Sequence, residues 1–190
     1  MSRASAPPVP DAGGLYQAAL HYLARYAATE AGLRRVLTQR IDRWARAQTD
    51  VDAAEPVITS ARQAIDDVVE RLVQAGAISD TAFAEHRAKS MVRAGRSNRA
   101  VQAGLVAKGV ASDVARAASV TDAGTELAAA LVLVRKRRIG PYREVLGDDA
   151  AIRVKAMGLL ARAGFSRDIA ERALDMPLEE AESRIQDLRR

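Results

Sequence analysis

The chain has 190 residues, of which 48% are hydrophobic and 4% aromatic, and its net charge is +5. This length is enough for one or two ordinary domains, and the hydrophobic fraction is enough for a packed core. Alanine, leucine and arginine predominate and favour helix over strand, so the composition excludes a large β-sandwich. Cysteine is absent, which excludes disulfides, thiolate zinc sites and cysteine nucleophiles.

No segment of the sequence has the length and hydrophobicity of a membrane span. The longest apolar run, Leu127 to Val134, is much shorter than the roughly 18 residues that a span requires, and four cations follow it directly. The N-terminus lacks a positively charged start followed by an apolar core, so no secretory signal is expected. Together with the absence of cysteine, these features predict a cytoplasmic protein without membrane association.

The N-terminal part of the chain predicts a tail followed by two helices. Residues 1–14 contain three prolines, two glycines and two serines, which predicts a disordered tail. An apolar residue recurs every four positions from Leu15 and predicts the first helix. Thr29 can cap the second helix, whose apolar stripe comprises Leu33, Val36, Leu37 and Ile41, with Trp44 one turn further.

A polar segment at 48–56 is expected to form an interhelical loop, because Pro56 is suited to a helix start. The next helix has the clearest amphipathic pattern in the chain, and acidic residues stay off its apolar face. Gly76 is expected to end this helix, and Gly95 a later one, since glycine readily adopts the left-handed conformation of a helix terminator. The apolar face comprises Ile58, Ala61, Ile65, Val68, Val69 and Leu72.

Two segments at an offset of 55 positions, 105–114 and 160–169, align without a gap. Each has a helix ended by glycine, an apolar residue that can pack back onto the last turn, and a polar cap for a new helix. Any helical hairpin can contain such a glycine terminator and polar cap, but two matching copies favour duplicated helical units. The glycines are Gly109 and Gly164, and the expected caps are Ser112 or Asp113 and Ser166.

This pattern predicts an all-α fold of tandem three-helix repeats. The repeats are expected at residues 15–78, 79–118 and 122–174, and residues 177–190 are expected to form a C-terminal tail that can be helical. The first repeat is longer than the others because it contains an acidic insertion.

The sequence offers no constellation of catalytic or metal-binding residues. Its two histidines, His21 and His86, fall in different predicted repeats and have no His or Cys at metal-ligand spacing. Neither a phosphate-binding glycine-rich loop nor a dinucleotide-binding fingerprint occurs. We therefore predict a binding protein that is not an enzyme and that uses no cofactor and no metal.

Positive charge is concentrated in two segments without any acidic residue. Residues 86–112 contain six lysines and arginines and residues 127–143 contain five, whereas residues 50–80 contain seven acids and two bases. Unpaired cations attract phosphates or an acidic protein groove. The expected contact residues are Arg87, Lys89, Arg93, Arg96, Arg99 and Lys108 and, as a second cluster, Arg135, Lys136, Arg137 and Arg138.

A purely structural interpretation is open for both clusters. The first can be a solvated basic face, and the second can stabilise a helix C-terminus through the helix dipole. Because aromatic residues are scarce, base stacking is not expected. A contact would therefore be made to a phosphate backbone or to a protein rather than to base edges.

Three groups of residues follow one another in an order that is typical of one known family. The first comprises Leu33-Arg34-Arg35-Val36-Leu37 and then Val68, Leu72, Gly76, Ile78, Asp80, Phe83 and Ala84. The second comprises Arg93, Gly95, Arg96, Arg99, Val101, Leu105, Lys108, Gly109 and Val110, and the third comprises Leu159, Leu160, Arg162, Gly164, Phe165, Ser166, Ile169 and Leu174. This order resembles the RecX family of RecA regulators over residues 15–174, most specifically over 72–110.

The resemblance implies tandem three-helix units in an elongated, curved array that binds in the groove of the RecA–DNA filament. It implies a negative regulator that inhibits strand exchange, ATP hydrolysis and the coprotease activity linked to the SOS response. The implied partners are the RecA filament and, through the basic faces, single- or double-stranded DNA, and a monomer is expected. The first repeat departs from the family pattern, because Arg40-Ile41 stands where the family usually has a glycine before the apolar residue.

Two other functions are compatible with these residues. The turns at Gly109 and Gly164 resemble those of helix-turn-helix transcription factors, but Asp113 and Asp168 follow them, where a base-reading helix would meet the negatively charged groove. The third possibility is a helical adaptor for an acidic protein partner, which would show no dependence on DNA.

Overall fold

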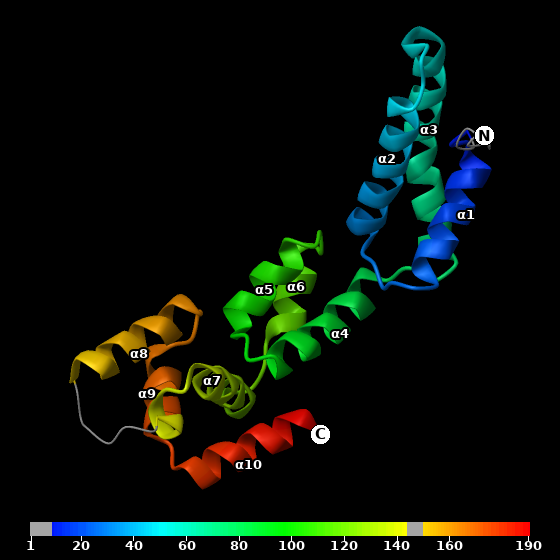
Figure 1. Cartoon of the computed structure of the whole chain (residues 1–190). Helices are drawn as coiled ribbons and strands as arrows, with labels where there is room; N and C mark the ends of the chain where they lie inside the picture. Colours follow the sequence, from blue (N-terminus) through cyan, green and yellow to red (C-terminus); the bar gives the residue numbers. More distant parts are fainter. Residues whose placement is uncertain (1–8, 144–149) are drawn as a thin grey trace, which may run out of the picture. The chain divides into compact units, whose positions relative to one another are not determined.

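The computed structural model describes residues 9–143 and 150–190, which form ten α-helices, one short 3₁₀ helix and no strand (Figure 1). The predicted all-α fold is therefore confirmed. The chain divides into two compact units, Met1–Phe83 and Ala84–Arg190.

The first unit consists mainly of three helices around one apolar core. These are α1 (Ala12–Leu23), α2 (Glu30–Arg46) and α3 (Val51–Gln74), with α2 and α3 packed side by side (Figure 1). Thr29 caps α2 as predicted, because its Oγ1 accepts the N–H of Gly32 at 2.9 Å. The core includes the predicted apolar face of α3, and that of α2 except for Val36, which is only partly buried. The core residues are Leu33, Leu37, Ile41 and Trp44 from α2, and Ile58, Ala61, Ile65, Val68, Val69 and Leu72 from α3.

Two predicted boundaries in the first unit are wrong. Residues 12–14, which the sequence assigns to a disordered tail, are helical, because Asp11 caps α1 through the N–H of Gly14 (2.7 Å). Residues 1–8 lie outside the described part. The loop predicted for 48–56 is also too long, since α3 begins at Val51 with Asp50 as its cap, and Pro56 lies inside the helix. Burial of Ala54 in the core stabilises this helical start.

The second unit is built around α7 (Ala123–Arg137), in which seven residues are buried. It is preceded by α4 (Asp80–Arg93), which continues from the first unit, and by α5 (Asn98–Val106) and α6 (Ser112–Ser119). A 3₁₀ turn (Gly140–Tyr142), α8 (Ala150–Arg162), α9 (Arg167–Asp175) and α10 (Leu178–Arg189) follow. Because α9 and α10 both pack on α7, this helix is the core element of the unit.

Glycines end the helices where the sequence predicts. Gly76, Gly95, Gly109 and Gly164 all have positive φ angles, between 70° and 92°. After each of these glycines the next residue donates its N–H back to the last helical turn, which is the geometry of a Schellman cap. The bonds are Ala77 N to Leu72 O (2.9 Å), Arg96 N to Met91 O (3.1 Å), Val110 N to Leu105 O (3.2 Å) and Phe165 N to Leu160 O (3.1 Å).

Of the helix caps predicted for the duplicated motif, one is confirmed and one is wrong. Ser166 caps α9, because its Oγ accepts the N–H of Ile169 at 3.3 Å. Neither Ser112 nor Asp113 caps α6, because the N-cap position is occupied by Ala111, which has no side-chain acceptor. The helices follow one another in threes, α1–α3, α4–α6 and α7–α9, and α10 comes last. The predicted residue limits of the three repeats stay a prediction.

Candidate polyanion-binding surface

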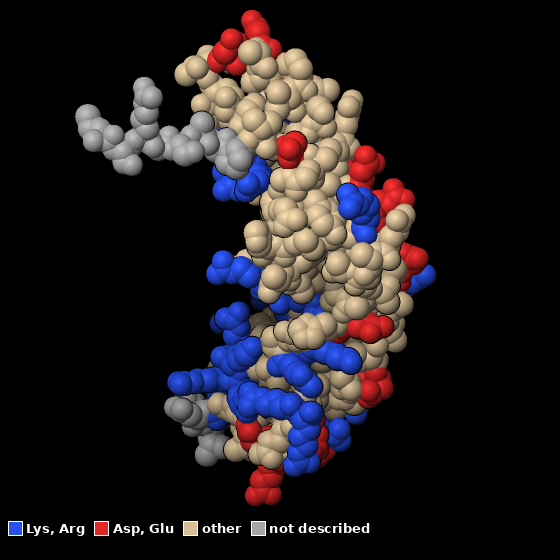
Figure 2. Space-filling view, turned by 90° about the vertical axis from the view of Figure 1, so that its right-hand side faces the viewer, with Lys and Arg blue, Asp and Glu red and all other residues tan. Residues whose placement is uncertain are grey.

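The first predicted basic cluster lies on α4, on the turn after it, on α5 and on the turn after α5. Figure 2 shows lysine and arginine side chains gathered over the second unit, with aspartate and glutamate mostly along its margin. All six predicted residues, Arg87, Lys89, Arg93, Arg96, Arg99 and Lys108, are exposed. Within the described part of the chain, neither Arg93, Arg96 nor Arg99 forms an ion pair. Their charge is therefore available to an anionic partner.

Ser97 fixes the turn that carries Arg96 and Arg99. Its side chain is fully buried, accepts the N–H of Ala100 at 3.2 Å as the cap of α5, and donates to the carbonyl of Ala163 at 2.6 Å. One hydroxyl thus caps a helix and ties that helix to the turn between α8 and α9. The two flanking arginines are held on the surface because Ser97 faces inward.

The nearby carboxylate of Glu126 is engaged by an amide rather than by an arginine. Its Oε2 accepts the side-chain N–H of Asn98 at 3.0 Å, and Thr121 donates to Asn98 Oδ1 at 2.8 Å. Glu126 lies in the first turn of α7, where a negative charge also complements the helix dipole. This pairing explains how an acid can lie close to the cluster and still leave Arg96 and Arg99 unpaired.

The second predicted cluster, at the C-terminal end of α7, is divided between structural and free charges. Arg135 is paired with Glu182 of α10 at 3.0 Å, so it is a structural residue rather than the free contact that the sequence predicts. Burial, together with the negative charge of the Glu182 carboxylate, raises the pKa of the neighbouring Tyr142 to about 12. Lys136 donates to the carbonyl of Ala94 at 2.6 Å but stays exposed.

Arg137 and Arg138 are also exposed, and neither forms an ion pair with any described carboxylate. Arg138 is also the one described non-glycine residue with a positive φ, at φ 51° and ψ 49°. A residue with a Cβ is strained in this left-handed conformation, whereas glycine is not. Such strain tends to be retained where the side chain has a function.

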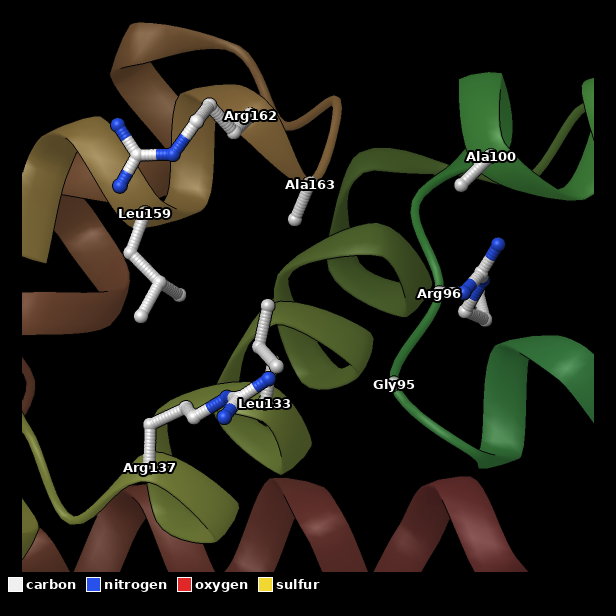
Figure 3. A pocket seen from close by; sticks show the side chains of 8 residues that line it. All are labelled: Gly95, Arg96, Ala100, Leu133, Arg137, Leu159, Arg162 and Ala163. Atoms are coloured by element: carbon white, nitrogen blue, oxygen red, sulfur yellow. The ribbon is translucent and has the colours of Figure 1, made fainter.

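The structure brings Arg96 and Arg137 together at one pocket and adds a third cation, Arg162, that the sequence does not assign to the site (Figure 3). The pocket has a volume of about 370 Å³. It is lined by Gly95, Arg96, Ala100, Leu133, Arg137, Leu159, Arg162 and Ala163, and we call it the arginine pocket. Sequence patterns miss Arg162 because it lies at the end of α8, far along the chain from both basic segments.

Within the described residues we find no group of three or more His, Asp or Glu side chains that could hold a metal ion.

None of the described helices is long and apolar enough to cross a membrane on its own. The segments Ser112–Ser119 and Ala123–Tyr142 meet the criteria of length and composition only as a pair, which is bent by 86°. Fold and surface thus define a helical-repeat protein with a basic face suited to polyanionic partners.

Comparison with known proteins identifies the family. The family model for the second three-helix domain of RecX matches residues 79–118. Regulatory protein RecX of Myxococcus xanthus is 38% identical over 164 residues, which are 85% of this chain and 84% of that protein. Regulatory protein RecX of Agrobacterium fabrum is 33% identical over 154 residues, or 75% and 82% of the two chains. The chain belongs to the RecX family of regulatory proteins.

A solved structure supports the fold independently. The crystal structure of RecX from Lactobacillus salivarius superposes with a TM-score of 0.61 and covers 94% of this chain and 97% of its own, at 19% identity. At that identity the likeness concerns the fold alone. It agrees with the tandem three-helix organisation described above.

Proposed function

We propose that this protein is a negative regulator of the RecA recombinase. It binds the RecA–DNA filament and inhibits ATP hydrolysis, strand exchange and coprotease activity, as a cytoplasmic monomer without catalytic activity of its own. Membership of the RecX family supports the regulatory role. The observation that carries the mechanism is the set of exposed arginines without ion pairs at the junction of α4 and α5, Arg93, Arg96 and Arg99.

The mechanism is electrostatic and steric. A DNA–protein filament presents rows of phosphates and acidic side chains, and cations without internal partners gain most from meeting them. Ser97 and the turn at Gly95 fix the arginines on the packed junction of α4 and α5. Ordering these side chains on binding therefore costs little conformational entropy. A helical body seated in this way blocks substrate access to the filament.

Reversing the central charges is expected to weaken inhibition without unfolding the protein. The variant Arg93→Glu/Arg96→Glu/Arg99→Glu should require about tenfold more protein to inhibit the ATPase of RecA on single-stranded DNA, because attraction becomes repulsion. The measurement is a titration into that ATPase assay, with circular dichroism to verify folding.

A matched triple variant separates local contacts from overall charge. Arg116, Lys155 and Arg189 are exposed and lie outside both predicted clusters, so Arg116→Glu/Lys155→Glu/Arg189→Glu changes the net charge equally. This control should inhibit nearly as well as the unmodified protein. If both triple variants inhibit normally, these arginines make no contact with the filament. A footprint at one defined duplex sequence would instead support a helix-turn-helix transcription factor.

Arg138→Gly is expected to stabilise the protein and at the same time to weaken its binding to single-stranded DNA. Relief of the left-handed strain should raise the free energy of unfolding by about 0.5–1 kcal/mol. Loss of the cation should weaken binding to oligothymidylate about twofold to threefold at low salt, because one phosphate contact is removed. Urea unfolding and fluorescence anisotropy measure the two effects. A glycine variant that is less stable than the unmodified protein would assign Arg138 a structural role.

A further inference from the structure

The arginine pocket has an apolar floor and a basic rim. Figure 3 shows the Leu133 side chain of α7 and the Leu159 side chain of α8 reaching into the space between the elements. Both leucines are only partly buried, although each lies beside fully buried neighbours such as Val134 and Leu160. Leucine side chains left at a concave surface favour an apolar group of a ligand, because burying them further releases water.

The rim consists of three arginines from three different elements. Arg96 lies on the turn after α4, Arg137 at the end of α7 and Arg162 at the end of α8, and Figure 3 shows Arg96 and Arg162 on opposite sides of the pocket. All three are exposed, and none is paired with a described carboxylate. Three cations without carboxylate partners at one pocket make its potential positive, so an anionic ligand is favoured there.

Gly158 makes room for one of these guanidinium groups. A Cβ atom at this position would lie 3.2 Å from Nη1 of Arg162, which means that the Arg162 side chain runs back along α8 over the space that a larger residue would occupy. The orientation of Arg162 is therefore set by the helix face on which it lies. This geometry keeps its charge at the pocket margin.

The polar side chains that line the pocket are hydrogen-bond donors only. Guanidinium groups carry five N–H donors and no acceptor, and the other lining residues are glycine, alanine and leucine. A nucleobase needs acceptors as well as donors to be recognised at its edge and aromatic side chains for stacking, and the lining provides neither. Carboxylates are acceptor-only and match the planar fork of arginine bidentately.

We propose that the arginine pocket binds an acidic peptide segment of a partner protein, with one large apolar side chain of that segment seated on Leu133 and Leu159. The carboxylates on either side of this apolar residue pair with Arg96, Arg137 and Arg162. This inference deepens the proposed function, on which it rests for the presence of a protein partner. It assigns the pocket to protein recognition and leaves DNA contacts to the rest of the basic surface.

The test measures peptide binding directly and without RecA. The probe is a fluorescein-labelled peptide in which a single leucine is flanked on both sides by glutamates and aspartates, and fluorescence anisotropy reports its binding to the full chain. A second peptide has serine in place of the leucine. We expect the first peptide to bind and the second to bind about tenfold more weakly, because the apolar anchor is lost.

Variants of the protein locate the site. Arg137→Glu/Arg162→Glu should weaken binding of the leucine peptide about tenfold, since two pairs of opposite charges become repulsive. Arg116→Glu/Lys155→Glu changes the net charge equally outside the pocket, as both residues are exposed and neither lines it, and should weaken binding less than about twofold at moderate salt. Circular dichroism of each variant confirms that it is folded.

Several results would overturn the proposal. Equal binding of the leucine and serine peptides would show that the pocket does not bind an apolar side chain. Equal losses of peptide affinity in the two double variants would show that only the net charge of the protein matters. Oligothymidylate that competes for the pocket, and that loses affinity in Arg137→Glu/Arg162→Glu as much as the peptide does, would assign the pocket to DNA. Because RecA is absent, peptide binding can fail while filament inhibition persists, and the two proposals are judged separately.

Discussion

Replacing Gly95 with alanine is expected to destabilise the protein by about 3 kcal/mol, of which left-handed strain and overpacking each contribute part. Gly95 has φ 87°, and a Cβ atom there would lie 3.0 Å from Val132 Cγ1, 3.1 Å from the backbone N of Leu133 and 3.2 Å from the carbonyl of Ala129. Two of these neighbours are backbone atoms of α7, the core helix of the second unit. They cannot move aside as a flexible side chain can.

Gly76 provides the matched control for this substitution. It also has a positive φ, at 70°, but a Cβ atom added to it would meet nothing within 4 Å. Gly76→Ala should therefore cost only the conformational strain, about 1 kcal/mol. Urea unfolding followed by far-ultraviolet circular dichroism measures both variants. Equal losses would mean that the turn after α4 does not press against α7, and the geometry described for the arginine pocket would be wrong.

The Gly95 substitution also affects function. The close approach of Gly95 to α7 brings Arg96 and Arg137 to the same pocket. A methyl group at this contact forces the turn away from α7, so that the distance between the two arginines increases. We therefore expect Gly95→Ala to weaken binding at the pocket even in conditions where the protein remains folded.

The local features of the fold are those that the sequence predicts well. Glycine terminators are visible because a left-handed residue at a helix end requires little beyond the identity of that residue. All four glycines that are expected to end helices adopt positive φ angles. Apolar stripes are equally local, and apart from Val36 those of α2 and α3 enter the core as predicted.

The helix starts are predicted less well, because several weak preferences compete there. In α1 the low helix propensity of Gly13 and Gly14 is outweighed by the Asp11 cap and by burial of Leu15 and Ala19. In α3 the proline signal at Pro56 is outweighed by the Asp50 cap, which lies well before the expected start. A proline near the start of a long helix with a buried apolar face removes one hydrogen bond without ending the helix.

The site depends on contacts between distant segments, which the sequence pattern does not contain. Arg135 appears unpaired within its own acid-free segment, but its partner Glu182 lies 47 positions further along the chain. In the same way, Arg162 reaches the pocket only because the turn after α8 lies against Ser97. Charge counts along the sequence can therefore locate a basic region but cannot tell a free arginine from a paired one.

Ser97→Ala is expected to destabilise the protein by about 2–3 kcal/mol, because the buried hydroxyl makes two hydrogen bonds and both are lost. The first caps α5 through the N–H of Ala100, and the second satisfies the carbonyl of Ala163 at 2.6 Å. Gly164 packs so closely on this hydroxyl that a Cβ atom there would lie 2.6 Å from Ser97 Oγ. No water can replace the missing group without moving the turn between α8 and α9.

Ser166 is the matched control, since its place relative to Gly164 is the same as that of Ser97 relative to Gly95. It caps α9 through the N–H of Ile169 at 3.3 Å, but its side chain is exposed rather than buried against a second element. Ser166→Ala should therefore cost about 1 kcal/mol, the value of a helix cap alone. Urea unfolding gives the loss of unfolding free energy in each variant. The difference between the two losses measures the contribution of the hydrogen bond from Ser97 to Ala163, which ties α5 to the turn after α8. If the two losses are equal, that bond contributes nothing, and Ser97 does not hold Arg162 at the pocket.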